Sequence, residues 1–277
     1  MEFIKHKNGI ILSDCKNFDP FLSCECGQCF RFEKVSDDNY LLFAMGRVLD
    51  IKRHISGWFF DNIDEAEFRE RFFDYFDLSR DYAEIIKSFE HDKVISASVT
   101  DGSGIRIFRQ DPFETLISFI ISQNNNIPRI KKIIESLCRL LGKEENGFYS
   151  FPTAEDIVNC GIEGLSPIKS GFRAKYIFDA SQKVASNEID LSEIPKMGYE
   201  NALNELKKIK GVGDKVANCV LLFGFGYYEA FPIDVWVKRV IAESYGEGFD
   251  PKTLGKYAGI AQQYIFEFIR TNYDRKA

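Results

Sequence analysis

The sequence lacks several features that would assign a protein to a specialised class. No uninterrupted apolar run approaches the roughly 18 residues that a membrane-spanning helix needs. The first residues, Met1–Lys7, are not followed by the apolar stretch of a secretory signal. We therefore expect a protein without a membrane partner that works in the cytoplasm, or in the nucleus if its source is eukaryotic.

Cysteine and histidine are too few and too scattered to predict a metal protein. The 7 cysteines are an odd number and the 3 histidines lie in unrelated contexts, which favours free thiols in a reducing compartment. Cys24, Cys26 and Cys29 are closely spaced, but no second cluster or histidine pair supplies further ligands. We therefore expect no metal ligands in the sequence and no iron–sulfur cluster, because no run of four cysteines has the required spacing.

The sequence also lacks an excess of positive charge. It has 36 basic and 42 acidic residues, a net charge of −6, and an acidic chain is a poor starting point for nucleic-acid binding. Residues 1–100 carry the whole imbalance, since residues 101–277 contain 23 residues of each sign. Any DNA-binding surface must rest on local clusters, which are equally typical of solvated helix faces: Lys207, Lys208, Lys210 and Lys215; Arg129, Lys131 and Lys132; Arg173 and Lys175.

What the chain does have is the composition and length of an ordinary globular protein. Hydrophobic residues make up 45% and charged residues 28% of its 277 residues, and this length favours two domains. The first hundred residues read as mixed α+β, with strand signals at 30–32, 40–51 and 58–60 and a helical pattern over 65–76. A turn-rich break at 100–104 predicts a boundary between domains 1–104 and 105–277.

Residues after 110 have the pattern of a helical domain. Asp111-Pro112 is a good helix start, an apolar run follows, and the polar tract Gln123–Asn126 interrupts it without a reason that helix formation supplies. Helical periodicity resumes at Ile130. Further helices are predicted over 153–159, 173–186, 199–209, 215–223, 235–245 and 254–270.

The segment from Leu206 to Ala217 carries the most specific signal. A helix ends at Gly211, a turn with two glycines follows, and a new helix begins near Asp214. Backbone N–H groups at such a turn can hold a phosphate without any basic side chain, although a plain helical hairpin explains the pattern equally well. Lys215 lies in the first turn of the new helix, where the dipole disfavours an ammonium, and a neutral lysine amine forms Schiff bases. Asp234 follows a proline and could act in chemistry or simply cap the next helix.

These residues resemble a known family. Ile209–Ala217 together with Phe231-Pro232-Ile233-Asp234 resembles the helix-hairpin-helix and Gly/Pro-Asp signature of base-excision DNA glycosylases, and the lysine marks the bifunctional members. Five further segments narrow the resemblance to the 8-oxoguanine DNA glycosylase branch, in family order across about 240 residues: 27–31, 109–112, 122–130, 171–176 and 261–266.

The resemblance implies a fold, an activity and a set of roles. The fold would be α+β, with an N-terminal antiparallel sheet domain followed by a helical domain that holds the helix-hairpin-helix. The enzyme would flip 8-oxoguanine out of duplex DNA, excise it through a Schiff base on Lys215 and then nick the strand by β-elimination, with Asp234 stabilising charge on the sugar. The partner would be double-stranded DNA with cytosine opposite the lesion, and the protein would be a monomer.

The remaining roles come from the same resemblance. The base would be bound by the Gly27 carbonyl, Cys219, Gln262 and Phe266. The DNA would be bound by Asn124, Arg129, Phe172, Arg173, Gly211 and Gly213. No cofactor would be required, although the turn around Ile209–Val212 would hold a structural cation through backbone carbonyls.

Three other functions stay open on the sequence. One is a glycosylase of the same superfamily for another damaged base, which the lysine and the missing iron–sulfur cysteines disfavour. Another is a DNA-lesion-binding protein without catalysis, in which Lys215 would be dispensable. The last is a helical protein with no DNA role whose matches are accidental.

Overall fold

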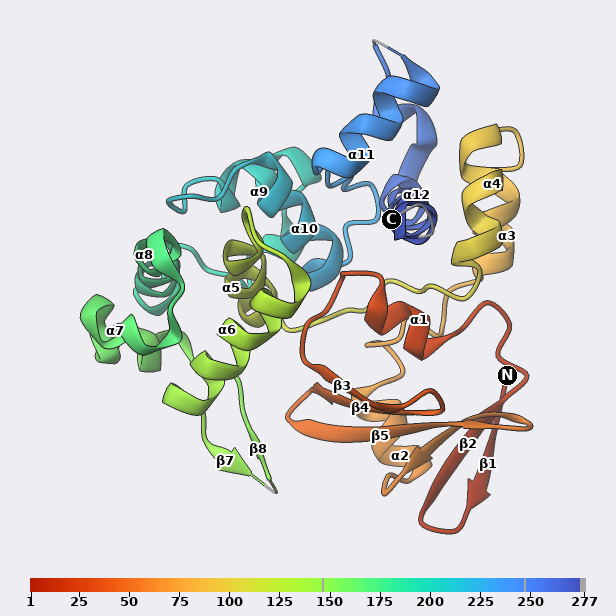
Figure 1. Ribbon diagram of the computed structural model, residues 1–277, viewed down its shortest axis with the longest axis horizontal. Coiled ribbons are helices and arrows are strands. Elements are labelled where there is room, and N and C mark those ends of the chain that lie inside the picture. Colours follow the sequence, from red (N-terminus) through yellow and green to blue (C-terminus); the bar gives the residue numbers. More distant parts are fainter. Residues whose placement is uncertain (146, 247, 275–277) are drawn as a thin grey trace. The chain divides into compact units, whose positions relative to one another are not determined.

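Six antiparallel strands form a sheet in the order β1-β2-β6-β5-β4-β3 in the computed structural model, which describes residues 1–145, 147–246 and 248–274 (Figure 1). The strands are β1 (Glu2–His6), β2 (Gly9–Ser13), β3 (Phe32–Ser36), β4 (Asn39–Ala44), β5 (Arg47–His54) and β6 (Gly57–Asp61). The stretch predicted as one strand over 40–51 is two strands, because Met45 and Gly46 turn the chain at positive φ. The sequence did not predict β1 and β2. An α+β fold with an N-terminal antiparallel sheet is confirmed.

The described chain packs as two units. Unit 1 is residues 1–109 with 227–277, and unit 2 is residues 110–226. The division into domains 1–104 and 105–277 stays a prediction. The helical segments of unit 1 are α1 (Pro20–Glu25), α2 (Glu65–Arg71), α3 (Tyr82–Ser88), α4 (Lys93–Gly102), α11 (Val235–Val240), η4 (Ile241–Tyr245), η5 (Pro251–Tyr257) and α12 (Ala258–Asp274).

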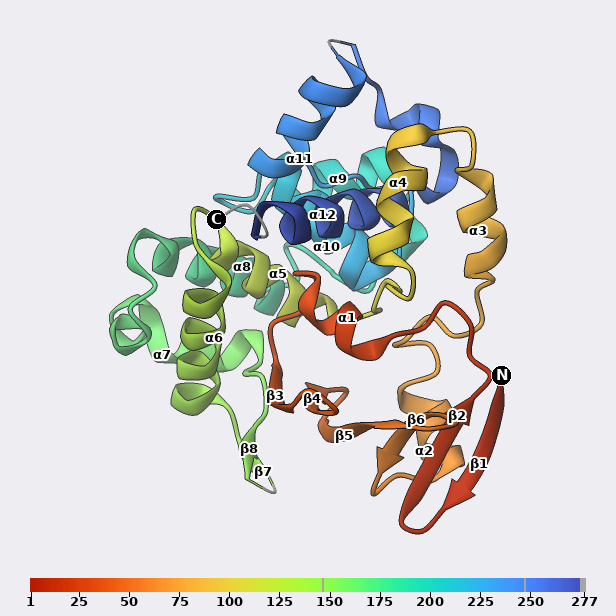
Figure 2. The ribbon, with the colours of Figure 1, turned by 45° about the vertical axis from the view of Figure 1, so that its right-hand side comes forward.

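Two sequence predictions in unit 1 need correction. The helix predicted over 65–76 ends at Arg71, and turns carry the chain onward while Phe72 and Phe76 stay fully buried. The break predicted at 100–104 lies later, because α4 continues to Gly102 and contacts α12 (Figure 2). A Cβ at Gly102 would lie 2.8 Å from the ring of Tyr264, so this glycine lets the two helices pack closely.

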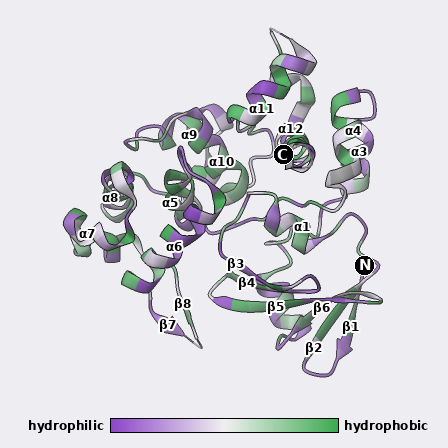
Figure 3. Cartoon of the chain, in the orientation of Figure 1, coloured by the Kyte–Doolittle hydropathy of each residue, from purple (hydrophilic) through white to green (hydrophobic). Residues whose placement is uncertain are grey.

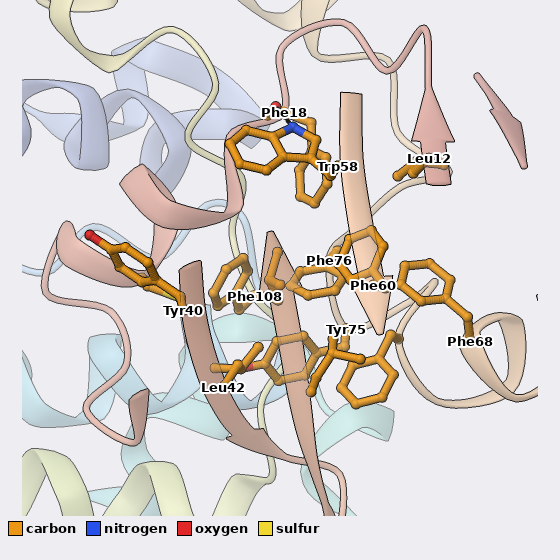
Figure 4. Packing of buried hydrophobic residues seen from close by; sticks show 14 of the residues in the cluster. Leu12, Phe18, Tyr40, Leu42, Trp58, Phe60, Phe68, Tyr75, Phe76 and Phe108 are labelled. Carbon is orange, nitrogen blue, oxygen red and sulfur yellow. Dashed lines mark hydrogen bonds between the residues drawn. The ribbon is translucent and has the colours of Figure 1, made fainter. Parts of the chain in front are cut away.

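Aromatic side chains build the core of unit 1 between the sheet and the segment after α2. Phe60 on β6 lies 4.6 Å from the ring of Phe68, and Phe76 lies 5.2 Å from Phe108 (Figure 4). Burying each such ring contributes roughly 1.5–3 kcal/mol. The four-residue spacing of Phe68, Phe72 and Phe76 therefore marks core packing.

Unit 2 is helical. Its helices are α5 (Pro112–Ser122), α6 (Ile127–Leu141), α7 (Ala154–Gly164), α8 (Ala174–Ala185), α9 (Tyr199–Leu206) and α10 (Asp214–Phe225), with the short hairpin of β7 (Glu144–Glu145) and β8 (Phe148–Tyr149) and the 3-10 turns η1 (Ser166–Ile168), η2 (Gly171–Arg173) and η3 (Ile194–Lys196). Asp111 caps α5 at Glu114 N with a 2.8 Å hydrogen bond, as predicted. The two most apolar helices, α5 and α10, pack together (Figure 3).

Candidate active site

The turn between α9 and α10 is a tight hairpin that depends on one glycine. Gly211 has a φ of +81°, and a Cβ at this position would lie 2.5 Å from the ring of Tyr176. The Val212 N–H donates to the carbonyl of Ile209 at 3.0 Å and closes the turn. A side chain at position 211 would strain the backbone and collide with that ring.

Side chains of α8 hold the hairpin from one side. The Lys210 N–H donates to Asp179 Oδ2 at 2.8 Å, and Lys183 Nζ donates to the carbonyl of Lys208 at 2.6 Å. Lys183 also lies 3.4 Å from the Asp179 carboxylate. The sequence reading assigned no role to Asp179 or Lys183, because neither belongs to the hairpin motif that they support.

The first turn of α10 is open to an external acceptor. Gly213 occupies its N-cap position, and no side chain among the described residues caps this helix. By contrast, Asn126 accepts a hydrogen bond from Arg129 N at the start of α6. The first N–H groups of such a helix and the positive end of its dipole are features that favour an anion.

Lys215 extends from this open turn into apolar surroundings. Its side chain is half-buried, and Nζ lies 4.9 Å from the ring centre of Phe119, which stacks on Phe223. Within the described chain no carboxylate pairs with Lys215, whereas Lys207 pairs with Asp214 at 2.6 Å. The amine is therefore held near a ring and left available for attack.

Cys219 lies one turn after Lys215 on α10. Its side chain is 2% exposed. Because residues four apart share a helix face, the thiol and the amine lie on the same side of α10. The buried thiol packs as a small apolar group.

All residues but one of the polar tract Gln123–Asn126 have a structural role. Gln123 ends α5, Asn125 Nδ2 donates to the Ile121 carbonyl at 3.1 Å, and Asn126 caps α6. Asn124 takes a left-handed backbone (φ 48°) and is exposed. Its side chain makes no hydrogen bond to any residue that the structure describes, so it faces outward without a structural task.

Arg173 joins this tract to the segment near η2. Arg173 is only 4% exposed. Its guanidinium donates hydrogen bonds to the backbone carbonyls of Gln123, Asn124 and Ser170, and the bond from Nη2 to the Asn124 carbonyl is 2.9 Å long. Burial, together with the nearby charge of Arg129, lowers the pKa of Arg173. Arg173 is expected to contact DNA, but its side chain already holds the backbone of residues 123, 124 and 170 in place.

Phe172 and Arg129 complete an exposed group on unit 2. The Phe172 ring is 48% exposed and lies edge-on to Tyr176, at 5.9 Å between ring centres. Arg129 is exposed at the start of α6. Tyr176 contacts both the Phe172 ring and the position of Gly211, so unit 2 brings an exposed aromatic ring close to the hairpin although the two lie far apart in the sequence.

Asp234 caps α11, as one of its two sequence interpretations predicted. Its Oδ1 accepts hydrogen bonds from Trp236 N at 3.0 Å and Val237 N at 2.8 Å. The residues on either side of the aspartate, Ile233 and Val235, are exposed and apolar. The cap uses Oδ1, and Oδ2 makes no hydrogen bond to any residue that the structure describes.

The other expected base-binding residues lie in unit 1. A Cβ at Gly27 (φ +79°) would lie 3.1 Å from Cε1 of Phe266, so the backbone of Gly27 packs against the edge of that ring. Gln262 precedes Phe266 by one turn of α12 and is 3% exposed. The structure therefore brings Gly27, Gln262 and Phe266 together in unit 1, whereas Lys215 and Cys219 belong to unit 2.

Gln28 supports Gly27 and is a residue for which the sequence reading proposed no role. Its buried amide donates to the carbonyls of Ser23 and Arg106 at 2.9 and 2.8 Å and accepts from Phe108 N at 2.7 Å. These bonds tie three segments of unit 1 together. The only sign of this role in the sequence was the position of Gln28 beside the motif residue Gly27.

Residues 1–145, 147–246 and 248–274 lack two further features, a metal-binding cluster and a membrane-spanning helix. No group of three or more His, Cys, Asp or Glu side chains could hold a metal ion there. No helix in this part of the chain has the length and apolarity to cross a bilayer.

Comparisons with known proteins agree with this arrangement. Residues 10–116 match the 8-oxoguanine DNA glycosylase N-terminal domain, and residues 117–254 match the HhH-GPD superfamily of base excision DNA repair proteins. A probable N-glycosylase/DNA lyase of Methanothermobacter thermautotrophicus is 31% identical over 76% of this chain and 77% of its own. An N-glycosylase/DNA lyase of Saccharomyces cerevisiae is 38% identical over 51% of this chain and 42% of its own.

A solved structure extends the likeness over nearly the whole chain. The 8-oxoguanine glycosylase/lyase of Clostridium acetobutylicum, in complex with double-stranded DNA containing cytosine opposite 8-oxoguanine, is 37% identical. It superimposes with a TM-score of 0.92 over 99% of each chain. The sequence, the fold and these matches together show that the chain belongs to the 8-oxoguanine DNA glycosylases of the HhH-GPD superfamily.

Proposed function

We propose that this protein excises 8-oxoguanine from duplex DNA, opposite cytosine, and then cleaves the strand at the resulting abasic site. One observation carries the proposal. Lys215 presents a half-buried amine, unpaired among the described residues, from an open helix N-terminus that directly follows the Gly211–Gly213 turn. An open helix N-terminus suits a phosphate and an unpaired amine suits attack on a sugar carbon.

In the proposed reaction, Lys215 supplies the nucleophile. Its Nζ lone pair forms a bond to C1′ of the deoxyribose, and the glycosidic electron pair leaves with the base, which takes up a proton. Opening of the sugar ring gives the Schiff base. Loss of a proton from C2′ then expels the 3′-phosphate, which is the β-elimination step.

Asp234 would stabilise the positive charge that develops on the sugar. Its Oδ1 is engaged in capping α11, which fixes the orientation of the carboxylate. A preorganised charge of this kind is effective because no reorganisation is needed during the reaction.

Four residues would bind the base. The Gly27 carbonyl would accept the N7–H that 8-oxoguanine has and guanine lacks, and Gln262 would read the Watson–Crick edge. Cys219 and Phe266 would contact the two faces of the base.

The DNA would be held chiefly by unit 2. The N–H groups beyond Gly211 and Gly213 would bind a phosphate, and Phe172 would act as a wedge beside the vacated stack. Asn124, Arg129 and Arg173 would contact the cytosine that loses its partner. We propose that the protein acts as a monomer.

A cation at the hairpin belongs to the proposal as well. Backbone carbonyls suit hard cations. The Ile209 carbonyl accepts one hydrogen bond, from Val212 N, and keeps a second lone pair. That carbonyl and its neighbours in the turn would hold the ion and stiffen the hairpin, with no part in the chemistry.

Borohydride trapping tests the proposal directly. A labelled duplex with one 8-oxoguanine opposite cytosine should give a covalent adduct with the wild-type protein and none with Lys215→Gln. The matched control is Lys207→Gln, which removes a neighbouring lysine that is ion-paired and should leave trapping intact. Binding of each variant to a duplex with a stable abasic analogue shows that it is folded.

Three outcomes would contradict the proposal or part of it. Trapping by Lys215→Gln at the wild-type level would remove this lysine from the reaction. Wild-type protein that binds the lesion duplex but gives neither free base nor adduct would be a lesion-binding protein. An adduct with another damaged base at a faster rate would change the substrate.

A further inference from the structure

Two neighbouring glutamines on α12 are joined through their side chains. Gln263 Nε2 donates to Gln262 Oε1 at 3.0 Å, and both residues are 3% exposed. Successive helix positions do not normally face each other, so both side chains must bend to make this bond. Gln263 Oε1 is buried without a partner among the described residues, which means that the pair is not held by a wider network on that side.

The bond restricts how the Gln262 amide can turn. With Oε1 of Gln262 accepting from Gln263, turning the Gln262 amide over would bring two NH2 groups together. A buried donor left facing another donor loses its hydrogen bond and keeps its desolvation penalty. Neither amide can therefore turn over alone, and the orientation of Gln262 is coupled to that of Gln263.

The orientation matters for the kind of base edge that Gln262 can read. A guanine-type edge presents an acceptor at O6 beside a donor at N1, whereas an adenine-type edge presents a donor at N6 beside an acceptor at N1. One orientation of an amide pairs with the first edge and the reverse orientation pairs with the second. Gln262 Oε1 keeps one lone pair for N1–H, and its Nε2 makes no hydrogen bond within the described chain, which leaves it for O6.

We infer that Gln263 is a positioning residue that locks the Gln262 amide for a guanine-type edge and so excludes adenine-type lesions. The inference rests on the proposed function, because it deepens the role of Gln262 there. Gln263 acts through Gln262 and touches no reacting atom. Its contribution is to specificity, since a site that leaves a wrong edge unpaired rejects it strongly.

The test is a double-mutant cycle with two substrates. Single-turnover kcat and KM are measured on duplexes that carry either 8-oxoguanine or 8-oxoadenine, for the wild type, Gln263→Leu, Gln262→Ala and the double variant. Gln263→Leu should lower the preference for 8-oxoguanine about tenfold, chiefly by improving KM for 8-oxoadenine. In the Gln262→Ala background the same change should leave the preference unaltered, because the amide that it positions is gone.

The matched control is Tyr264→Phe, which removes a buried hydroxyl without a partner from the next position of α12 and should not change the preference. The inference would be overturned if Gln263→Leu lowered the rates on both substrates equally. It would also be overturned if this substitution had the same effect with and without Gln262. A wild-type protein without activity on 8-oxoguanine would instead overturn the proposed function. Thermal unfolding of each variant separates these results from a failure to fold.

Discussion

The two units of the chain begin their helices differently. In unit 1, carboxylates cap the first turns of α1, α2, α3, α4 and α11, from Asp19, Asp64, Asp81, Asp92 and Asp234. In unit 2, Asp111, Asn126 and Thr153 cap α5, α6 and α7, but α8, α9 and α10 begin without a side-chain cap from any described residue. A helix that carries its own carboxylate has no room for a phosphate, whereas an open first turn attracts one.

Net charge would not have separated the units in this way. Residues 110–226 contain 14 basic and 15 acidic residues, against 22 and 27 in the rest of the chain, so neither unit is basic. The comparison teaches that open backbone N–H groups offer an acidic chain places for a phosphate that its net charge does not reveal. The glycine N-caps of α9 and α10 keep those groups accessible.

The largest effect on the rate of base release is expected at Asp234, the helix cap to which we also assign a role in the chemistry. Asp234→Asn keeps the cap, because asparagine caps as well as aspartate, but removes the charge. Single-turnover base release should fall by a factor on the order of 10²–10³ with little change in the melting temperature. Asp234→Ala should lose in addition about 1 kcal/mol of stability.

Asp111→Asn is the control for Asp234, since Asp111 caps α5 in unit 2 and lies outside the proposed chemistry. It should alter neither the rate nor the stability appreciably. An unchanged rate in Asp234→Asn would make that residue a cap alone, and unit 1 would then contribute only the residues proposed to bind the base.

The next largest effect should come from closing the hairpin turn of unit 2. Gly211→Ala puts a Cβ at positive φ and 2.5 Å from the Tyr176 ring. The backbone penalty is roughly 1–2 kcal/mol and overpacking adds about 1–3 kcal/mol, to be measured by denaturant unfolding. Gly161→Ala is matched in φ (+72°) with nothing within 4 Å, so it should show the backbone penalty alone. Equal losses in the two variants would show that the ring tolerates the methyl group.

The difference between the units can be reversed by adding a side-chain cap to α10 of unit 2. Gly213→Asp introduces a carboxylate at the N-cap of α10, where the backbone is extended and a Cβ meets nothing within 4 Å. Stability should rise by a few tenths of a kcal/mol. The Kd for duplex DNA should rise about tenfold, or about 1.4 kcal/mol, because the carboxylate takes the place of a phosphate.

Gly198→Asp controls for this change. Gly198 is the N-cap of α9, also without a neighbour within 4 Å, and it lies at the end of α9 away from the hairpin. It should stabilise the protein to the same degree and leave the Kd unchanged. Equal DNA affinity in both variants would show that the open turn of α10 binds no phosphate.

Local signals in the sequence predicted the helices of unit 2 well. The capping residue Asp111 and the two-glycine turn act within a few residues, so a linear pattern reveals them, whereas the sequence did not predict Asn126 as the cap of α6. The helix predicted over 199–209 nonetheless ends at Leu206. The three residues that follow form the approach to the hairpin, which α8 holds through Lys208 and Lys210.

What the sequence could not supply depends on contacts between distant segments. Arg173 was expected to face DNA, and nothing in the sequence indicates that its guanidinium donates to carbonyls 49 and 50 residues earlier. Gln28 likewise makes its bonds to the backbone of residues about 80 positions away. The candidate site residues could be named from motifs, but the side chains that hold them in place required the fold.

The smallest effect is expected at Arg129, an exposed cation at the start of α6 in unit 2. If Arg129 reads the cytosine opposite the lesion, Arg129→Ala should reduce the preference for cytosine over adenine by about fivefold, or roughly 1 kcal/mol. Base release opposite cytosine should change less than this ratio. The control is Arg139→Ala on the same helix, where the guanidinium is engaged by Glu135 at 2.9 Å. A preference that falls equally in both variants would indicate a general loss of positive charge, and unit 2 would then bind the backbone of DNA without reading the opposite base.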